Sequence, residues 1–167
     1  MFTYLRSLTA LAFTLTTSLF VSHSTDWIRQ HNVQRLQETR ECFRCNLSQA
    51  NLVGANLART NLLAADLQGA DLRRASLRGA VLEWADLRGA NLEGAALTGV
   101  NLENASLDEA NLQKTDLRES NLKGADLRNV NLSRANLVRA SITHIAKTTV
   151  LCHTTLVDGT IASRSCH

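Results

Sequence analysis

The cysteines and histidines near the C-terminus are the residues of this 167-residue chain best suited to metal binding. Cys152 is followed directly by His153, and Cys166 by His167. Two thiolates and two imidazoles are a ligand set that zinc accepts, so an enzyme or metal-binding protein built on these four residues is one hypothesis. The spacing of the two pairs is not that of a usual zinc site, and a Cys152–Cys166 disulfide is the competing interpretation.

A second cysteine pair, Cys42 and Cys45, has the C-x-x-C spacing of metal and redox motifs. A zinc ribbon needs a second C-x-x-C, and a thioredoxin-like motif needs a βαβ context; the sequence contains neither. Two interpretations remain for this pair: buried, unreactive thiols, which we favour, and a local disulfide.

Nothing in the rest of the sequence suggests catalysis. No histidine occurs between residues 45 and 143, and no grouping of Ser, His and Asp is apparent. We therefore expect no catalytic residue, no cofactor and no metal, and the chain is predicted not to be an enzyme. The formal net charge of +3 is too small to require a nucleic-acid partner.

Residues 1–24 are predicted to be a signal peptide. One cation, Arg6, precedes an uncharged apolar run of 14 residues, 8–21, which is shorter than a membrane-spanning helix. An uncleaved anchor is the alternative. If this segment is cleaved, we expect an exported protein that is not stably inserted in a membrane. Because exported proteins retain disulfides, this compartment favours the Cys152–Cys166 bond, which would close a C-terminal cap.

The middle of the chain is a tandem repeat of five residues. Residues 45–144 contain 20 consecutive units without an insertion; the third residue is Leu in 19 of them and Ile142 in the last. The first residue is Ala in 14 units, and the second is Asn or Asp in 15. A period of five fits neither a helix nor a strand, so it indicates a stacked repeat with its first and third residues inside.

Seven of the eight glycines occupy the fifth position of a unit. This phase predicts a turn with positive φ, as at the third residue of a type II turn. Where the fifth residue is Arg59, Trp84 or Glu109, we expect a turn with negative φ instead. The interchange of Asn and Asp at the second position suggests a shared hydrogen bond to the backbone.

This A-[ND]-L-x-x pattern resembles the pentapeptide-repeat proteins over 100 of the 167 residues. The resemblance implies an all-β solenoid, a right-handed quadrilateral β-helix of about five coils with four units in each. The C-x-x-C before the first unit resembles exported cyanobacterial members, and the tail resembles members from the thylakoid lumen. The resemblance therefore implies export to the thylakoid lumen or the periplasm.

The open ends of such a coil need covers, because unpaired edges promote aggregation. Residues 25–41 are predicted to form an N-terminal capping helix, with Thr25 or Asp26 as its N-cap. Residues 42–144 form the predicted β-helix, and residues 145–167 form a C-terminal cap closed by the disulfide.

The outward positions suggest how the coil meets a partner. Leu63, Val81 and Trp84 form the one outward apolar cluster. It has two interpretations: packing of Trp84 on the neighbouring coil, which we favour, and a docking patch for an unknown protein. Arg88, Asp108 and Arg128 lie in one column of the stacked coils, and their alternating charges predict a salt-bridge ladder. The outward charges of residues 45–144 sum to zero.

The favoured function is a non-enzymatic exported structural or interaction module. The alternative implied by the family, a DNA-mimicking inhibitor of a type II topoisomerase, requires a strongly acidic rod.

Overall fold

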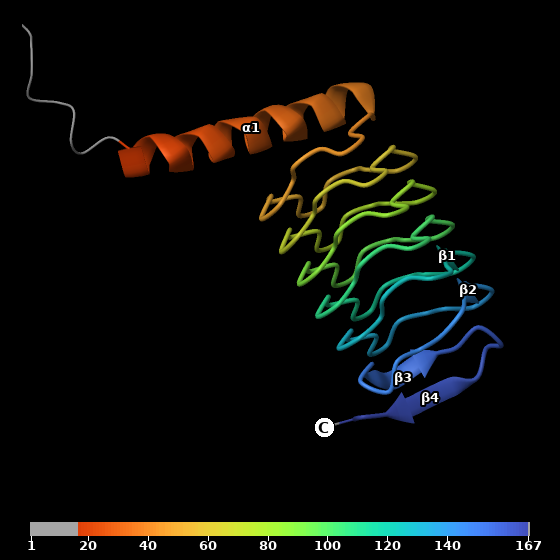
Figure 1. Cartoon of the computed structure of the whole chain (residues 1–167). Coiled ribbons are helices and arrows are strands. Elements are labelled where there is room, and N and C mark those ends of the chain that lie inside the picture. Colours follow the sequence, from red (N-terminus) through yellow and green to blue (C-terminus); the bar gives the residue numbers. More distant parts are fainter. Residues whose placement is uncertain (1–16, 167) are drawn as a thin grey trace, which may run out of the picture.

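A computed structural model describes residues 17–166, with side chains from residue 28 onward. A long helix lies across one end of a stack of coils, and a hairpin lies at the other end (Figure 1). Only short stretches of each coil are regular strand, because every side is interrupted by a turn. The elements are α1 (Thr17–Thr39), β1 (Asn121–Leu122), β2 (Ser141–Ile142), β3 (Leu151–Thr155) and β4 (Ile161–Arg164).

The stack is a coil with four units per turn. Second-position residues pair in parallel with those exactly one coil, or 20 residues, further on, as in Asn46 with Asp66 and Asn61 with Val81. The same spacing joins β1 to β2, where Asn121 pairs with Ser141. Backbone hydrogen bonds follow this register, so each coil satisfies the polar groups of the next.

The core is a column of leucines along the axis of the coil. All 19 third-position leucines of the repeat are buried, with at most 3% of any one exposed. The small first-position residues lie beside them and are mostly buried as well. The predicted inward direction of the first and third residues is confirmed.

The turn after each of the first nineteen units has positive φ at its fifth position, whatever residue occupies it; the last unit, which ends at His144, lacks this turn. The N–H of Ala50 donates to the carbonyl of Leu47 at 3.0 Å, which closes a four-residue turn with Gln49 third. The expectation of negative φ at non-glycine positions is wrong: φ is 57° at Arg59, 59° at Trp84 and 62° at Glu109. The ladder bonds to the next coil force the same corner on these nineteen units, and they outweigh the left-handed strain of a side chain.

The coil continues beyond the recognisable repeat. Asn131 pairs with Val150 and Asn136 with Thr155, a spacing of 19 residues in place of 20. The chain therefore omits one residue and then resumes two further units, at residues 149–153 and 154–158. Their inward residues Thr149, Leu151 and Thr154 are buried.

Helix α1 is longer than the sequence suggested. It begins at Thr17, so the prediction of Thr25 or Asp26 as N-cap is wrong; no proline or glycine interrupts the segment before them. Its C-terminal half contacts the first coil through fully buried Leu36 and a hydrogen bond from Asn32 Nδ2 to the carbonyl of Asn46 at 2.9 Å. The predicted segment 1–24 lies mainly outside the described residues.

Candidate functional sites on the coil surface

The second-position amides and carboxylates support the backbone. In all fifteen units with Asn or Asp there, Oδ1 accepts a hydrogen bond from the N–H of the fourth residue, as from Ser48 to Asn46 at 3.0 Å. This N–H faces away from the ladder, so the side chain supplies the acceptor that it lacks. The backbone role predicted for these residues is confirmed, and their carboxylates need no catalytic explanation.

Four of the aspartates also pair with an arginine two residues later. Asp116 accepts from Nη2 of Arg118 at 2.7 Å and from the hydroxyl of Thr98 at 3.0 Å. The bond with Arg118, with a smaller contribution from Thr98, lowers the pKa of Asp116 to about 2. The other pairs are Asp71–Arg73, Asp86–Arg88 and Asp126–Arg128.

These pairs replace most of the predicted ladder in the column of residues 88, 108 and 128. Arg88 binds Asp86 of its own unit at 2.6 Å, and Arg128 lies 2.6 Å from Asp126 but 3.9 Å from Asp108. The second and fourth residues of one unit both face outward, so this pairing is shorter than one between coils.

The predicted docking patch lies on one side of the coil. The Trp84 indole is 61% exposed and its Nε1 donates to Glu83 at 3.1 Å; Val81 is exposed and Leu63 half-buried. Phe43, which the sequence reasoning missed, is 49% exposed and occupies the same column as Leu63, one coil earlier. The irregular unit 40–44, with Arg and Glu in its first two positions, hid this phenylalanine from the repeat pattern.

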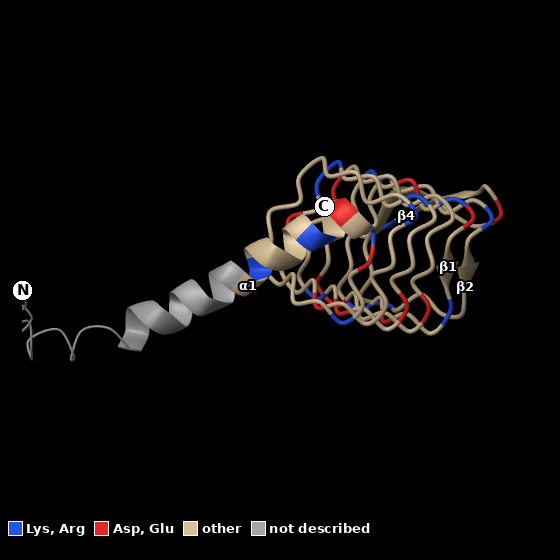
Figure 2. Ribbon diagram, turned by 90° about the horizontal axis from the view of Figure 1, so that it is seen from above, with Lys and Arg blue, Asp and Glu red and all other residues tan. Residues whose placement is uncertain are grey.

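The arginine after Phe43 lies beside the patch. The Arg44 guanidinium lies 5.0 Å from the centre of the Phe43 ring, and its backbone N–H donates to the carbonyl of Leu63 at 3.0 Å. Ala64 is stacked directly above the Glu83–Trp84 corner by the bond from its N–H to the Glu83 carbonyl. We call Phe43, Leu63, Val81 and Trp84 the aromatic patch. Charges of both signs are interspersed along the edges of the coils (Figure 2).

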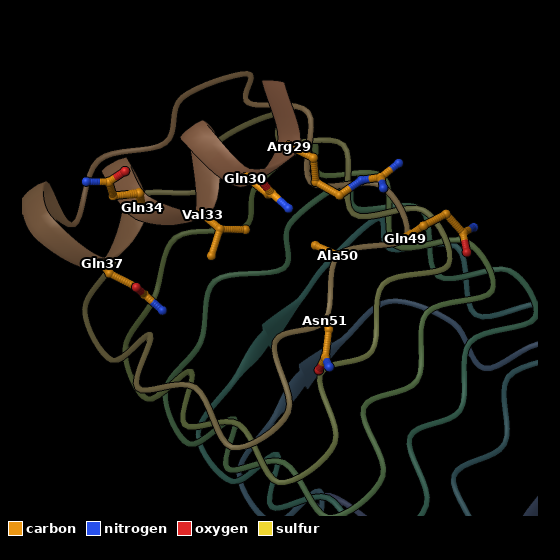
Figure 3. A pocket seen from close by; sticks show the side chains of 8 residues that line it. All are labelled: Arg29, Gln30, Val33, Gln34, Gln37, Gln49, Ala50 and Asn51. Carbon is orange, nitrogen blue, oxygen red and sulfur yellow. The ribbon is translucent and has the colours of Figure 1, made fainter. Parts of the chain in front are cut away.

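A hollow of about 430 Å³ lies between α1 and the first coil (Figure 3). Its walls are mostly amide side chains, with Val33 on the helix and Ala50 on the coil as apolar contacts. A wall of neutral amides offers hydrogen bonds but no nucleophile, acid or base. The lining residues are Arg29, Gln30, Val33, Gln34, Gln37, Gln49, Ala50 and Asn51.

All four cysteines are in disulfides. Cys42 is bonded to Cys45, and both are buried, so they face the core as predicted, but the local disulfide replaces the free thiols that we favoured. The four-residue turn between them brings their Cα atoms within 5.2 Å, close enough for the bond. Cys152 is bonded to Cys166, with Cα atoms 4.9 Å apart.

Within residues 28–166, whose side chains are described, one group of three metal-ligating side chains occurs: Cys152, His153 and Cys166. It is part of the C-terminal set considered from the sequence, whose fourth member, His167, lies outside the described residues. In the oxidised chain both sulfurs are engaged in the disulfide. Helix α1, the single helix described, is not long and apolar enough to cross a membrane.

Comparison with known proteins identifies the repeat. The family model for pentapeptide repeats matches residues 41–79, 65–104, 85–124 and 105–143, which together exceed half of the chain. The family recognised from the five-residue pattern is therefore confirmed. No curated protein is significantly similar to the sequence.

Solved structures of pentapeptide repeat proteins are also similar to this chain. HetL, a protein involved in heterocyst differentiation regulation in Nostoc sp. strain PCC 7120, is 36% identical, with 73% of this chain and 60% of HetL covered and a TM-score of 0.31. Rfr23 from Cyanothece 51142 is 30% identical (72% and 97% covered, TM-score 0.35). A protein from the Arabidopsis thaliana thylakoid lumen is 25% identical (67% and 68% covered, TM-score 0.33). The chain thus spans about 60% of the length of HetL.

Proposed function

Because this chain belongs to the pentapeptide repeat family, we propose that it is a non-enzymatic interaction module, exported from the cytoplasm, that docks a protein partner through its aromatic patch. The exposed indole of Trp84 is the observation that carries this proposal. The coil buries nearly all its large apolar side chains, yet it presents Trp84, Val81 and Phe43 on one side. Trp is the side chain most enriched among residues that dominate the energy of protein interfaces.

A stiff coil with covered ends suits a protein that binds a partner without catalysing a reaction. We propose a right-handed square coil whose two ends are covered, by α1 at the first coil and by the disulfide-closed hairpin at the last. The buried Leu36 on α1 and the bonded Cys152 and Cys166 support these two caps. A stiff rod with covered ends holds the patch in one geometry and limits self-association.

Export is supported by the two disulfides and by the apolar segment near the N-terminus. We propose a destination in the thylakoid lumen or the periplasm. Cleavage before Thr25 would leave residues 25–39 of α1, which include the contacts made by Asn32, Val33 and Leu36. The cap would therefore survive processing.

The export proposal is tested by expressing the full chain in a bacterium with a periplasm and measuring the mass of the protein in each fraction. We expect a periplasmic species that begins near Thr25 and has no free thiol. A cytoplasmic species that retains Met1 would contradict it.

The docking proposal is tested by cross-linking the chain in its native compartment and identifying the bound proteins by mass spectrometry. Trp84→Ala should remove a specific partner, since it deletes the centre of the aromatic patch. Val53→Ala is the matched control, because Val53 is a similarly exposed apolar residue on another side of the coil. Equal recovery of every partner with both variants would refute the patch as the docking site.

The topoisomerase alternative is less well supported by the surface. A DNA mimic needs a continuous acidic face, whereas the charges of residues 45–144 cancel and both signs are interspersed along the coils. Purified protein is therefore expected to leave the supercoiling activity of DNA gyrase unchanged at equimolar amounts.

A further inference from the structure

The C-terminal disulfide lies at an irregularity of the hairpin formed by β3 and β4. Leu151 pairs with Arg164, and Thr154 pairs with Ala162, so β3 has one residue more than β4 between these pairs. Cys152 and His153 together therefore lie opposite the single residue Ser163, which is a β-bulge.

The bulge changes the direction of two neighbouring side chains. In a regular strand, successive residues point to opposite faces, so Cys152 and His153 would be separated by the sheet. Here His153 has φ of 54°, because it occupies the fifth, corner position of the unit 149–153. This turn places its imidazole beside the sulfur of Cys152.

Three ligand atoms converge as a result. The two sulfurs and one imidazole nitrogen all lie within 4.8 Å of one another. His153 and Cys166 are exposed and Cys152 is half-buried, so reductants and ions in solution can reach the group. The position of Cys152 is held by the hydrogen bond from the N–H of Arg134 to its carbonyl at 2.8 Å.

We propose that reduction of the Cys152–Cys166 disulfide creates a zinc site formed by these two thiolates and the imidazole of His153. A dithiol reductant transfers two electrons and two protons to the disulfide, breaks the S–S bond and becomes a disulfide itself. Zn²⁺ then binds the two sulfurs and the neutral imidazole, and the two thiol protons are released to solvent. The oxidised chain does not bind zinc at this place, since the sulfurs are bonded to each other.

The geometry requires little movement. With Zn–S of about 2.3 Å and Zn–N of about 2.0 Å, tetrahedral ligands lie roughly 3.3–3.8 Å apart. The broken disulfide lets the sulfurs move apart to this distance, and the imidazole is already within 4.8 Å of both. Three protein ligands leave the fourth position to water, as in zinc sites that are not closed.

The second disulfide provides an internal comparison. Cys42 and Cys45 are also two cysteines close together, but they are buried, and no histidine or carboxylate among residues 28–166 joins them in a group of three. Reduction there yields two thiols without a third ligand. Zinc should therefore bind to the reduced Cys152–Cys166 pair and not to the reduced Cys42–Cys45 pair.

The test uses the full chain, fully oxidised or fully reduced with a dithiol and then desalted under argon. Zinc chloride is the probe, and bound metal is measured by equilibrium dialysis with elemental mass spectrometry. We expect one zinc per reduced chain and none per oxidised chain. His153→Ala should weaken zinc binding by the reduced chain at least tenfold, whereas His144→Ala, which changes a histidine outside the group, should leave it unchanged.

A Cys152→Ser, Cys166→Ser double variant tests whether the ion is bound by these two sulfurs. Far-UV circular dichroism checks that each variant retains the fold of the oxidised wild type. Absence of zinc from this variant supports the proposal. Zinc bound by the double variant, equal affinity in His153→Ala, or no zinc in the reduced wild type would each overturn it. These outcomes do not depend on export or on the aromatic patch.

Discussion

At the scale of single residues, two positions of each unit serve the backbone in different ways. In fifteen units the second residue supplies an acceptor for the N–H of the fourth, and in nineteen the fifth residue adopts positive φ at the corner. Asn and Asp are frequent at the second position because their side chains are short and bond locally. Glycine is frequent at the fifth because it has no Cβ to strain, although the corner also tolerates side chains such as those of Trp84 and Glu109.

Gly89 isolates the effect of this strain. A Cβ added there meets no atom within 4 Å, and φ is 63°, so Gly89→Ala changes the backbone energy without a clash. We expect a loss of about 1 kcal/mol in the free energy of unfolding, measured by chemical denaturation. The reverse change at an equivalent corner, Ala64→Gly, should have the opposite sign; a loss of stability in both variants would contradict the interpretation.

The pairing of Asp116 with Arg118 predicts acid sensitivity. Because the pKa of Asp116 falls from an ordinary value of 3.8 to about 2, the unfolded chain binds a proton before the folded chain does. This stabilisation is complete above about pH 4–5 and is lost as pH falls toward 2.

Thermal unfolding between pH 5 and pH 2 measures this effect. Asp116→Asn keeps the acceptor for the Arg118 N–H but loses the charge, so its midpoint should fall less steeply with acid than that of the wild type. Asp66→Asn is the control, because Gln68 replaces an arginine two residues later. Identical profiles for Asp116→Asn and wild type would show that the pair does not contribute.

At the scale of the elements, each unit is one side of the coil, and neither a helix nor a wide sheet is needed to form the core. The stability of the coil comes from stacking, because the leucine of one unit packs against those of the coils before and after it. The third position therefore tolerates least change, and the fourth position tolerates most.

Leu97 and Gln113 test this contrast. Leu97 is fully buried in the middle of the rod, so Leu97→Ala should lower the free energy of unfolding by about 2–5 kcal/mol. Gln113 occupies an outward fourth position, and Gln113→Ala should change it by less than about 0.5 kcal/mol. Denaturant titration measures the free energy of unfolding of both variants. Similar losses at the two positions would contradict an axial core.

At the scale of the whole molecule, α1 lies across one end of the stack of coils and the β3–β4 hairpin lies at the other end (Figure 1). The last half of α1 contacts the first coil, and the coil itself continues into the unit 154–158 at the end where the hairpin lies. An uncovered end would expose unpaired backbone groups and a ring of leucines.

Leu36→Asp tests the N-terminal cover. It places a charge where α1 meets the first coil and should detach the helix while the repeat remains folded. We expect concentration-dependent oligomers in analytical ultracentrifugation, with little change in the far-UV spectrum of the coil. Arg35→Asp, which places a carboxylate at an exposed position on α1 that does not line the hollow, should remain like wild type.

The repeat could be derived from the sequence because a leucine at every fifth position can be buried only if the units stack. The inward leucines and the local role of Asn46 and its equivalents follow from position within the unit. The 61% exposure of Trp84 does not, because the favoured expectation was that its side chain packs on the neighbouring coil. The corner at Arg59 could not be derived, since local preference alone disfavours positive φ there, and only the ladder between coils imposes it.

The sequence by itself thus determined the family, the period and the interior of the rod. The tertiary structure alone revealed that the units 149–153 and 154–158 extend the coil after a residue is omitted. It also decided that Cys42 bonds to Cys45 and that a bulge brings His153 to the second disulfide. The reason is physical: period and polarity are properties of adjacent residues, whereas the register between coils and the convergence of side chains depend on contacts made across many residues of chain.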